Sequence, residues 1–223
     1  LSAPFSASWP ESLYTPLEKL PTSAKELFEY NPEKAKELLA EAGYPAGFKT
    51  TLVCGNTPVT LDRNSMLVAY WKAIGVDVTL QPKDYVVLLT TMMGWKQEAM
   101  LETGKYNGTP MSILSIMGTS LTDKPTGSWN AACFWPPEFK ERLDKAEATF
   151  DLADRNRQLK ELNVWLIDQA PYVWLATSKS YNYWWPWVKN YYGEYSVGAG
   201  IIGPFYASIW LDRDLKEKMI GKR

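Results

Sequence analysis

The chain has 223 residues, with 24 Lys and Arg against 25 Asp and Glu, 11 Trp, two Cys and no His. This length allows one large domain or two small ones, each with a buried core. A formal charge of −1 excludes the strongly basic surface typical of nucleic-acid binding. The lack of His excludes Ser-His-Asp and Cys-His catalysis and His-ligated metal sites within this chain.

The first predicted elements follow a proline-rich start. Residues 1–30 carry four prolines and are expected to be extended, with one short helical turn over 23–29. The first long helix is predicted from Asn31, a suitable N-cap, to Gly43, a typical C-terminal stop. Its apolar side chains recur at helical spacing.

Strands and helices alternate after this helix. Strands are predicted at 48–54, 76–80, 111–117 and 171–177, and helices at 62–74, 84–94, 137–150 and 154–169. Strands separated by helices of ten or more residues indicate an α/β fold. We therefore expect a mixed, partly parallel sheet flanked by helices.

Four carboxylates near the predicted helix pair have two interpretations. A glycosidase needs two acids facing one cleft, which would make this a carbohydrate-active enzyme domain. The other interpretation is a solvated outer helix face and turn, and it is the better one because the helix is amphipathic. The residues are Asp144, Glu147, Asp151 and Asp154. We expect no catalytic residue and no enzyme, and a stand-alone interaction module is a further alternative.

The aromatic residues of 181–195 are a second ambiguous feature. Eight aromatics in this stretch form either a platform for sugar rings and peptide side chains or a packed strand pair. The packed arrangement is favoured. Cys54 and Cys133 likewise form either one disulfide or two small buried side chains, and the second alternative is favoured.

Five stretches, in order, resemble a known family. They are NPEKAKELLAEAGYPAGF at 31–48, the helix–strand–helix at 65–92, the paired helices running into APYVWL at 135–175, PWVKNYYGE at 186–194 and IWLDRDLK at 209–216. Together they are similar to the bacterial extracellular solute-binding proteins of family 5, receptors for peptide, nickel and oligosaccharide ABC transporters. The resemblance extends from about residue 25 to 220.

The resemblance implies the C-terminal lobe of a longer receptor, with a type II periplasmic-binding-protein fold. Residues 1–30 would lead in from the hinge and 31–196 would form the lobe. Residues 197–223 would return toward an absent N-terminal lobe and be poorly ordered or packed non-natively here. The lobes would capture an oligopeptide or oligosaccharide and deliver it to ABC permease subunits, without a cofactor. A periplasmic or extracellular location follows, with a lipid anchor in an N-terminal region as an option.

The resemblance also implies a ligand loop after 111–117. In peptide-binding relatives an Asp in this loop, near a Gly-Trp pair, meets the ligand's ammonium group. Here Gly118 is present, the Trp is absent, Asp123 falls late and the amine-binding position is closer to Ser120. A hydroxyl cannot offer a charge-assisted bond, so an uncharged ligand such as an oligosaccharide gains weight. Nickel is disfavoured without His. The candidate ligand contacts in this loop are Met117, Gly118, Thr119, Ser120 and Asp123. Trp129, Asn130 and Trp135 are added from the residues themselves, because Gly, Ser, Asn and two Pro mark a loop around them, in which the tryptophans either bind a ligand or pack in the core.

Overall fold

The computed structural model describes residues 4–5, 9–104, 108–118, 129–175, 181–193 and 203–222. The chain divides into two compact units, Leu1–Leu175 and Ala176–Arg223. The units are described separately below.

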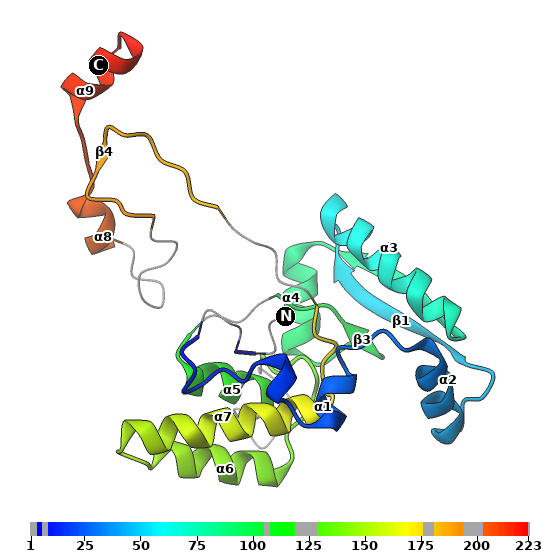
Figure 1. The fold of residues 1–223 in the computed structure, drawn as a ribbon. Coiled ribbons are helices and arrows are strands. Elements are labelled where there is room, and N and C mark those ends of the chain that lie inside the picture. Colours follow the sequence, from blue (N-terminus) through cyan, green and yellow to red (C-terminus); the bar gives the residue numbers. More distant parts are fainter. Residues whose placement is uncertain are drawn as a thin grey trace. The chain divides into compact units, whose positions relative to one another are not determined.

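A three-stranded parallel sheet is the centre of the first part of unit 1. Its strands are β1 (Phe48–Gly55), β2 (Val76–Lys83) and β3 (Met100–Leu101), in the order β2-β1-β3. Both pairings are parallel. Helix α3 (Pro58–Ala73) joins β1 to β2, and α4 (Tyr85–Met93) leads back to β3. Right-handed crossovers running in opposite directions put the two helices on opposite faces of the sheet (Figure 1). The predicted α/β class is confirmed.

The sheet buries an apolar layer against its helices. Leu52, Cys54, Val76 and Val78 are buried in this layer. Strand β2 starts with the predicted alternation of buried and exposed residues, whereas β1, the central strand, buries Val53 as well. Leu39 of α2 (Pro32–Glu41) packs against this layer, and α2 begins at the predicted N-cap, Asn31. These elements therefore follow directly from sequence periodicity.

Three helices form the other half of unit 1. They are α5 (Pro110–Gly118), α6 (Pro137–Glu147) and α7 (Leu152–Asp168). Their shared core includes Leu114, Phe139, Leu162 and Leu166. The start of the chain packs against it: Phe5 and Leu13 are buried in the same core. The short helices η1 (Leu17–Lys19) and α1 (Thr22–Glu26) follow, and α1 contacts α7.

Two predicted strands of unit 1 are wrong. Residues 111–117 form helix α5, because Thr109 accepts a hydrogen bond from the Ser112 N–H and Pro110 occupies the first helical position. A short apolar run cannot distinguish a buried helix from a buried strand. Pro171–Leu175 form no strand, and 176–177 lie outside the described residues. Helix α6 also ends at Glu147 rather than at 150, which leaves Phe150 fully exposed.

Unit 2 holds the aromatic stretch. Strand β4 (Val188–Lys189) pairs antiparallel with β5 (Trp210–Leu211), and helices α8 (Gly203–Ser208) and α9 (Arg213–Ile220) flank β5 in the chain. Trp187 is buried, but Tyr183 is 88% and Trp185 63% exposed. The packed interpretation is therefore wrong for most of the described aromatics, although Trp185 stacks on Trp187 at 4.8 Å. Residues 194–195 lie outside the described part.

The two cysteines are free thiols. Cys54 is buried, as predicted, but Cys133 is exposed, so that part of the prediction is wrong. Within the described residues, no helix combines the length and the hydropathy that a membrane crossing needs.

The start of the β1–β2 pairing depends on two glycines. Gly47 precedes Phe48, and Gly75 precedes its register partner Val76. A Cβ on Gly47 would lie 1.9 Å from the Gly75 carbonyl oxygen, and Gly47 has a φ of +73°. Only glycine satisfies both conditions.

We expect Gly47→Ala to destabilise unit 1 by about 2–4 kcal/mol, since it combines positive φ with a backbone clash. Gly43→Ala is the matched control, because Gly43 has a φ of +91° but open space around it. It should cost only about 1 kcal/mol. Urea unfolding followed by circular dichroism measures both, and equal losses would contradict the close approach.

Candidate functional site

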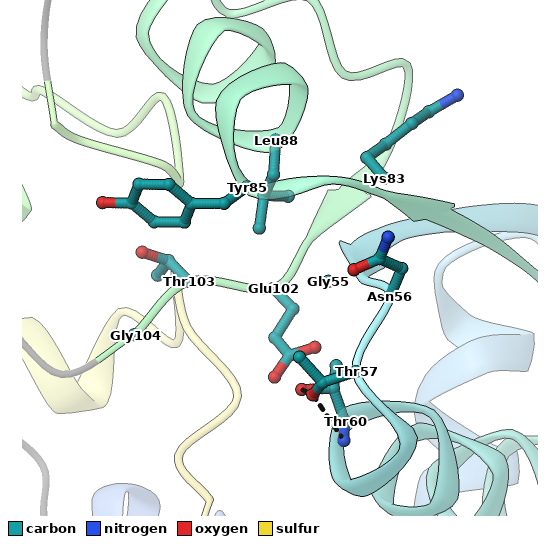
Figure 2. Close-up of a pocket in the computed structure, with 10 residues that line it drawn as sticks. All are labelled: Gly55, Asn56, Thr57, Thr60, Lys83, Tyr85, Leu88, Glu102, Thr103 and Gly104. Atoms are coloured by element: carbon teal, nitrogen blue, oxygen red, sulfur yellow. Dashed lines mark hydrogen bonds between the residues drawn. The ribbon is translucent and has the colours of Figure 1, made fainter.

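A pocket of about 220 Å³ opens where the three parallel strands end (Figure 2). Ligands of α/β proteins bind outside the carboxyl ends of such strands, which makes this pocket the candidate site. Its lining residues are Gly55, Asn56, Thr57, Thr60, Lys83, Tyr85, Leu88, Glu102, Thr103 and Gly104.

Two helix starts shape the pocket. Thr57 is the N-cap of α3, and its hydroxyl accepts a hydrogen bond from the Thr60 N–H at 3.4 Å. Asp84 is the N-cap of α4 and accepts from the Val86 and Val87 N–H groups at 3.0 and 3.1 Å. These caps fix the turns directly after β1 and β2. Tyr85, which follows Asp84, is thereby placed at the pocket.

One carboxylate of the pocket is tied to α3. The Glu102 side chain is only 15% exposed and forms an ion pair with Arg63. Its second oxygen accepts a hydrogen bond of 2.7 Å from the side-chain amide of Asn64, which is fully buried. Glu102 comes directly after β3, so this contact joins the end of the sheet to the helix beside it.

The predicted ligand contacts that the structure describes lie elsewhere in unit 1. Met117 and Gly118 are buried at the end of α5, and a Cβ on Gly118 would meet the Phe139 ring at 2.3 Å. Thr119, Ser120 and Asp123 lie outside the described residues. Of the predicted contacts that are described, none lines the pocket.

Asn130 belongs to an interior polar network. Its side chain is fully buried, and its amide donates to the Phe134 carbonyl at 2.6 Å. The Tyr172 hydroxyl lies 3.1 Å from both the Asn130 amide oxygen and the Met117 carbonyl. Two predicted residues, Met117 and Asn130, are thus brought together through Tyr172. The network satisfies buried polar groups, as interiors require.

The two predicted tryptophans are partly exposed. Trp129 is 39% and Trp135 45% exposed. Trp135 stacks on Trp95 with a ring-centroid separation of 4.5 Å and an interplanar angle of 28°. The Gln97 side-chain amide reinforces this loop contact by donating to the Ala131 carbonyl at 3.1 Å.

The pocket residues had a usable signal in the sequence. Asn56 and Thr57 follow the predicted strand 48–54, and Lys83 and Asp84 follow the strand beginning at Val76. Polar residues after successive parallel strands meet at one edge of a sheet. Glu102, Thr103 and Gly104 follow a strand of only two residues, which periodicity cannot reveal.

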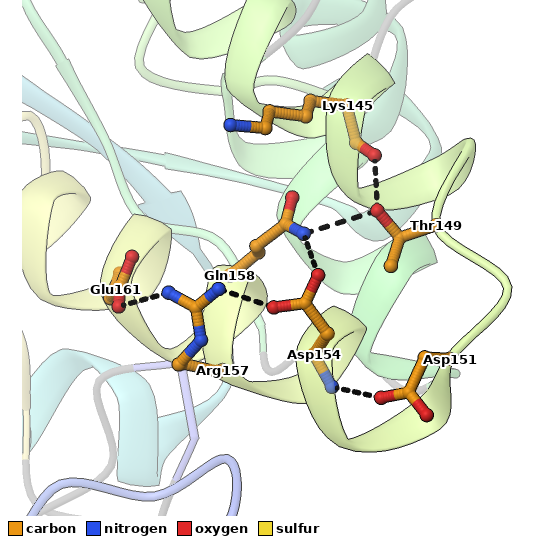
Figure 3. A network of polar contacts seen from close by, with 7 residues as sticks. All are labelled: Lys145, Thr149, Asp151, Asp154, Arg157, Gln158 and Glu161. Carbon is orange, nitrogen blue, oxygen red and sulfur yellow. Dashed lines mark hydrogen bonds and ion pairs between the residues drawn. The ribbon is translucent and has the colours of Figure 1, made fainter.

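The carboxylates considered for catalysis lie at the α6–α7 turn. Asp151 is the N-cap of α7 and accepts from the Asp154 N–H at 2.7 Å. Asp154 and Glu161 both pair with Arg157, and Asp154 also accepts from the Gln158 amide (Figure 3). Asp144 pairs with Lys140. Asp144, Asp151 and Asp154 therefore cap or pair at the surface, and Glu147 lies exposed at the end of α6, as the preferred interpretation predicts. In the described part of the chain, no three Cys, Asp or Glu side chains are grouped to hold a metal.

A substitution that removes one hydroxyl and keeps the ring tests the interior network. Tyr172→Phe should lower the free energy of unfolding by about 1–3 kcal/mol, because it removes the hydroxyl that lies 3.1 Å from the Asn130 amide oxygen and from the Met117 carbonyl. The control is Tyr30→Phe, since Tyr30 is 79% exposed and its change should stay within about 0.5 kcal/mol. Thermal unfolding of both variants measures the difference, and an unchanged Tyr172→Phe stability would contradict the network.

The Asp154 carboxyl gives unit 1 an acid-sensitive contact. The hydrogen bond from Arg157 holds the pKa of Asp154 below its usual value of 3.8. A lowered folded-state pKa stabilises the fold above the unfolded-state pKa, and this stabilisation is lost as pH falls through the folded value. Asp154→Asn should therefore flatten the decline of the melting temperature on acidification below about pH 5. An identical decline in both proteins would contradict this.

The comparisons with known proteins agree with this architecture. A sequence profile of "Bacterial extracellular solute-binding proteins, family 5 Middle" matches residues 2–133. The chain belongs to this family. Heme-binding protein A of Haemophilus influenzae is 32% identical over 74% of the chain, and the dipeptide-binding protein of Escherichia coli is 30% identical over 68%. The chain spans only 30% and 29% of the lengths of these two family 5 relatives.

Solved structures show the same fold. The periplasmic binding protein DppA from Helicobacter pylori, in complex with the peptide STSA, matches with a TM-score of 0.60 and 25% identity, over 74% of this chain and 31% of that one. HbpA2 from Haemophilus parasuis matches with a TM-score of 0.62 and 24% identity, over 77% and 32%. The periplasmic-binding-protein fold predicted from the family 5 resemblance is therefore confirmed.

Proposed function

We propose that the chain is the C-terminal lobe of an ABC-transporter substrate-binding protein. It captures a solute, an oligopeptide or an oligosaccharide, in a cleft closed by a second lobe, and the closed receptor delivers the solute to membrane permease subunits. The lobe binds and does not catalyse. It works in the periplasm or at the outer cell surface, with a lipid anchor in an N-terminal region as the means of attachment.

The position of the pocket carries this proposal. It opens at the carboxyl ends of β1, β2 and β3, and its volume of about 220 Å³ is below the 300–1,000 Å³ range of complete ligand sites. A pocket of this size holds one group of a larger solute and leaves the rest to another surface. The chain's share of about 30% of its relatives' length is consistent with a second lobe that supplies that surface.

The proposed ligand surface has two parts. The pocket around Glu102 takes one end of the solute, and the loop 129–135 contributes exposed aromatic faces through Trp129 and Trp135. Met117 and Asn130 support that loop from the interior through Tyr172. The placement of Thr119, Ser120 and Asp123 beside the solute stays a proposal.

Blocking the pocket tests the function. A Cβ on Gly104 would meet no atom within 4 Å, so Gly104→Trp adds a bulky ring to the pocket lining without a clash at its root. Native mass spectrometry of the intact protein, purified from the cells that produce it, should show a bound solute. The Gly104→Trp protein should lose at least about 90% of it, a change of about 1.4 kcal/mol or more in binding.

The control places the same ring on a remote surface. Glu41→Trp, at the exposed end of α2, should retain the solute in full. Equal occupancy in the Gly104→Trp protein would reject the pocket as the site. Absence of any solute mass from the unaltered protein, together with no saturable binding of peptides or saccharides, would reject the function.

A further inference from the structure

The pocket lining contains one acidic and one basic residue, and only the acidic one faces the other lining side chains. Among its described lining residues, Glu102 is the acidic side chain and Lys83 the basic one. The Lys83 side chain extends away from the other labelled side chains, whereas Glu102 reaches toward the start of α3 (Figure 2). Glu102 is therefore the group that decides which charge the pocket presents.

The Glu102 carboxylate is already compensated. Arg63 pairs with one oxygen, and the buried Asn64 amide donates to the other at 2.7 Å. The carboxylate is only 15% exposed, while Arg63 is 46% exposed. Because both partners come from α3, the same helix that Thr57 caps at the pocket holds the carboxylate in place.

An ammonium group would be a poor ligand for this arrangement. It would have to share Glu102 with Arg63, and bringing a second cation to a partly buried pair adds like-charge repulsion. A neutral hydroxyl meets no such penalty, since a compensated carboxylate still has free lone pairs to accept its proton.

The remaining lining suits a neutral, hydroxyl-rich group. Thr57, Thr60 and Thr103 line the pocket with hydroxyls, and Asn56 contributes an amide with both donors and acceptors. The Thr57 hydroxyl donates to that of Thr60 at 2.9 Å and the Thr103 hydroxyl to the Met92 sulfur at 3.5 Å, so a ligand would bind through their remaining lone pairs or in exchange for these contacts. Tyr85 adds an aromatic ring that is 72% exposed. Figure 2 shows Tyr85 and Thr103 on one side of the pocket and Asn56, Thr57 and Thr60 on the other. An aromatic face with surrounding hydroxyl and amide groups can hold a sugar ring by stacking and hydrogen bonds.

We infer that Arg63 is a specificity-determining residue that makes this pocket select an uncharged polyhydroxyl group, such as a sugar ring, over an ammonium group. It acts through Glu102, as a positioning and charge-cancelling partner. This inference rests on the proposed function, and it narrows the solute to the oligosaccharide class. Removal of Arg63 leaves Glu102 with one neutral partner and should turn the pocket toward cations.

The test compares ligands that differ in one charge. The 223-residue chain, labelled with ¹⁵N, is titrated with the peptide Ser-Thr-Ser-Ala, with its N-acetylated form, and with maltotriose, cellotriose and chitotriose. Amide resonances of Asn56, Thr57 and Thr103 report on the pocket. In the unaltered chain we expect a saccharide to shift these resonances saturably and the two peptides to bind equally weakly.

Variants then separate charge from structure. Arg63→Met, with Arg63→Gln as the second choice if the first misfolds, should favour the free-amine peptide over the acetylated one by about fivefold or more. Adding Glu102→Gln to either variant should abolish that preference. Arg142→Met is the matched control, because Arg142 is 45% exposed and also pairs with a glutamate, Glu138, on a remote helix. Arg142→Met should leave the affinities for the free-amine and the N-acetylated peptide equal.

Two results would overturn the inference. One is a preference of the unaltered chain for the free amine that Glu102→Gln removes, which would make Glu102 an ammonium receptor. The other is the absence of pocket shifts with every saccharide at about 20 mM, a concentration that reveals even millimolar affinity. Neither result touches the proposed function as long as Gly104→Trp removes the solute that co-purifies with the intact protein.

Discussion

The parallel pairing of β1 with β2 is the constraint on which the site depends. Register pairs run from Phe48 with Val76 to Gly55 with Lys83, so both strands end at the same level. The turns that follow each strand are therefore forced to the same edge, and β3 adds its own end beside β1. The close approach of Gly47 and Gly75 sets this level from the opposite end of the strands.

Helix starts convert that edge into a site. A helix that follows a strand begins beside the strand's carboxyl end, and its first N–H groups need acceptors. Thr57 and Asp84 supply them, which fixes two short turns without help from a ligand. The pocket is thus preorganised by local capping, and the contact of Glu102 with α3 fastens the end of β3 to the same frame. Preorganisation of this kind lowers the entropy cost of binding.

Much of the fold could be predicted from the sequence because periodicity and caps are local signals. Helix α2, strands β1 and β2, and helices α6 and α7 carry such signals, and their helix ends need adjustment by only a few residues. Helix α5 was predicted as a strand because a short apolar run is buried in either conformation. The exposure of the aromatic side chains in unit 2 could not be predicted. The sequence shows how apolar a side chain is, but its burial depends on which residues pack against it.

The site was harder to predict for a related reason. Asn130 is predicted as a ligand contact because it is a polar residue in a loop with Trp and Gly. Its side chain instead donates to the Phe134 carbonyl and accepts from the Tyr172 hydroxyl inside the fold. A buried loop must satisfy its own polar groups, so polar loop residues divide between interior and surface in a way that only tertiary packing decides. The residue types of a loop therefore identify candidates and leave their roles open.

The charge of the pocket likewise depends on tertiary packing. Read alone, a glutamate at a strand end marks a cation site, because an isolated carboxylate attracts cations. In this chain its amide partner Asn64 is 38 residues away in the sequence, and the ion-pairing Arg63 lies next to it on α3. Arg63 and Asn64, which are neighbours on α3, thus determine whether the Glu102 carboxylate presents a negative charge or a compensated one. The charge that this pocket presents therefore depends as much on residues behind the lining as on the lining itself.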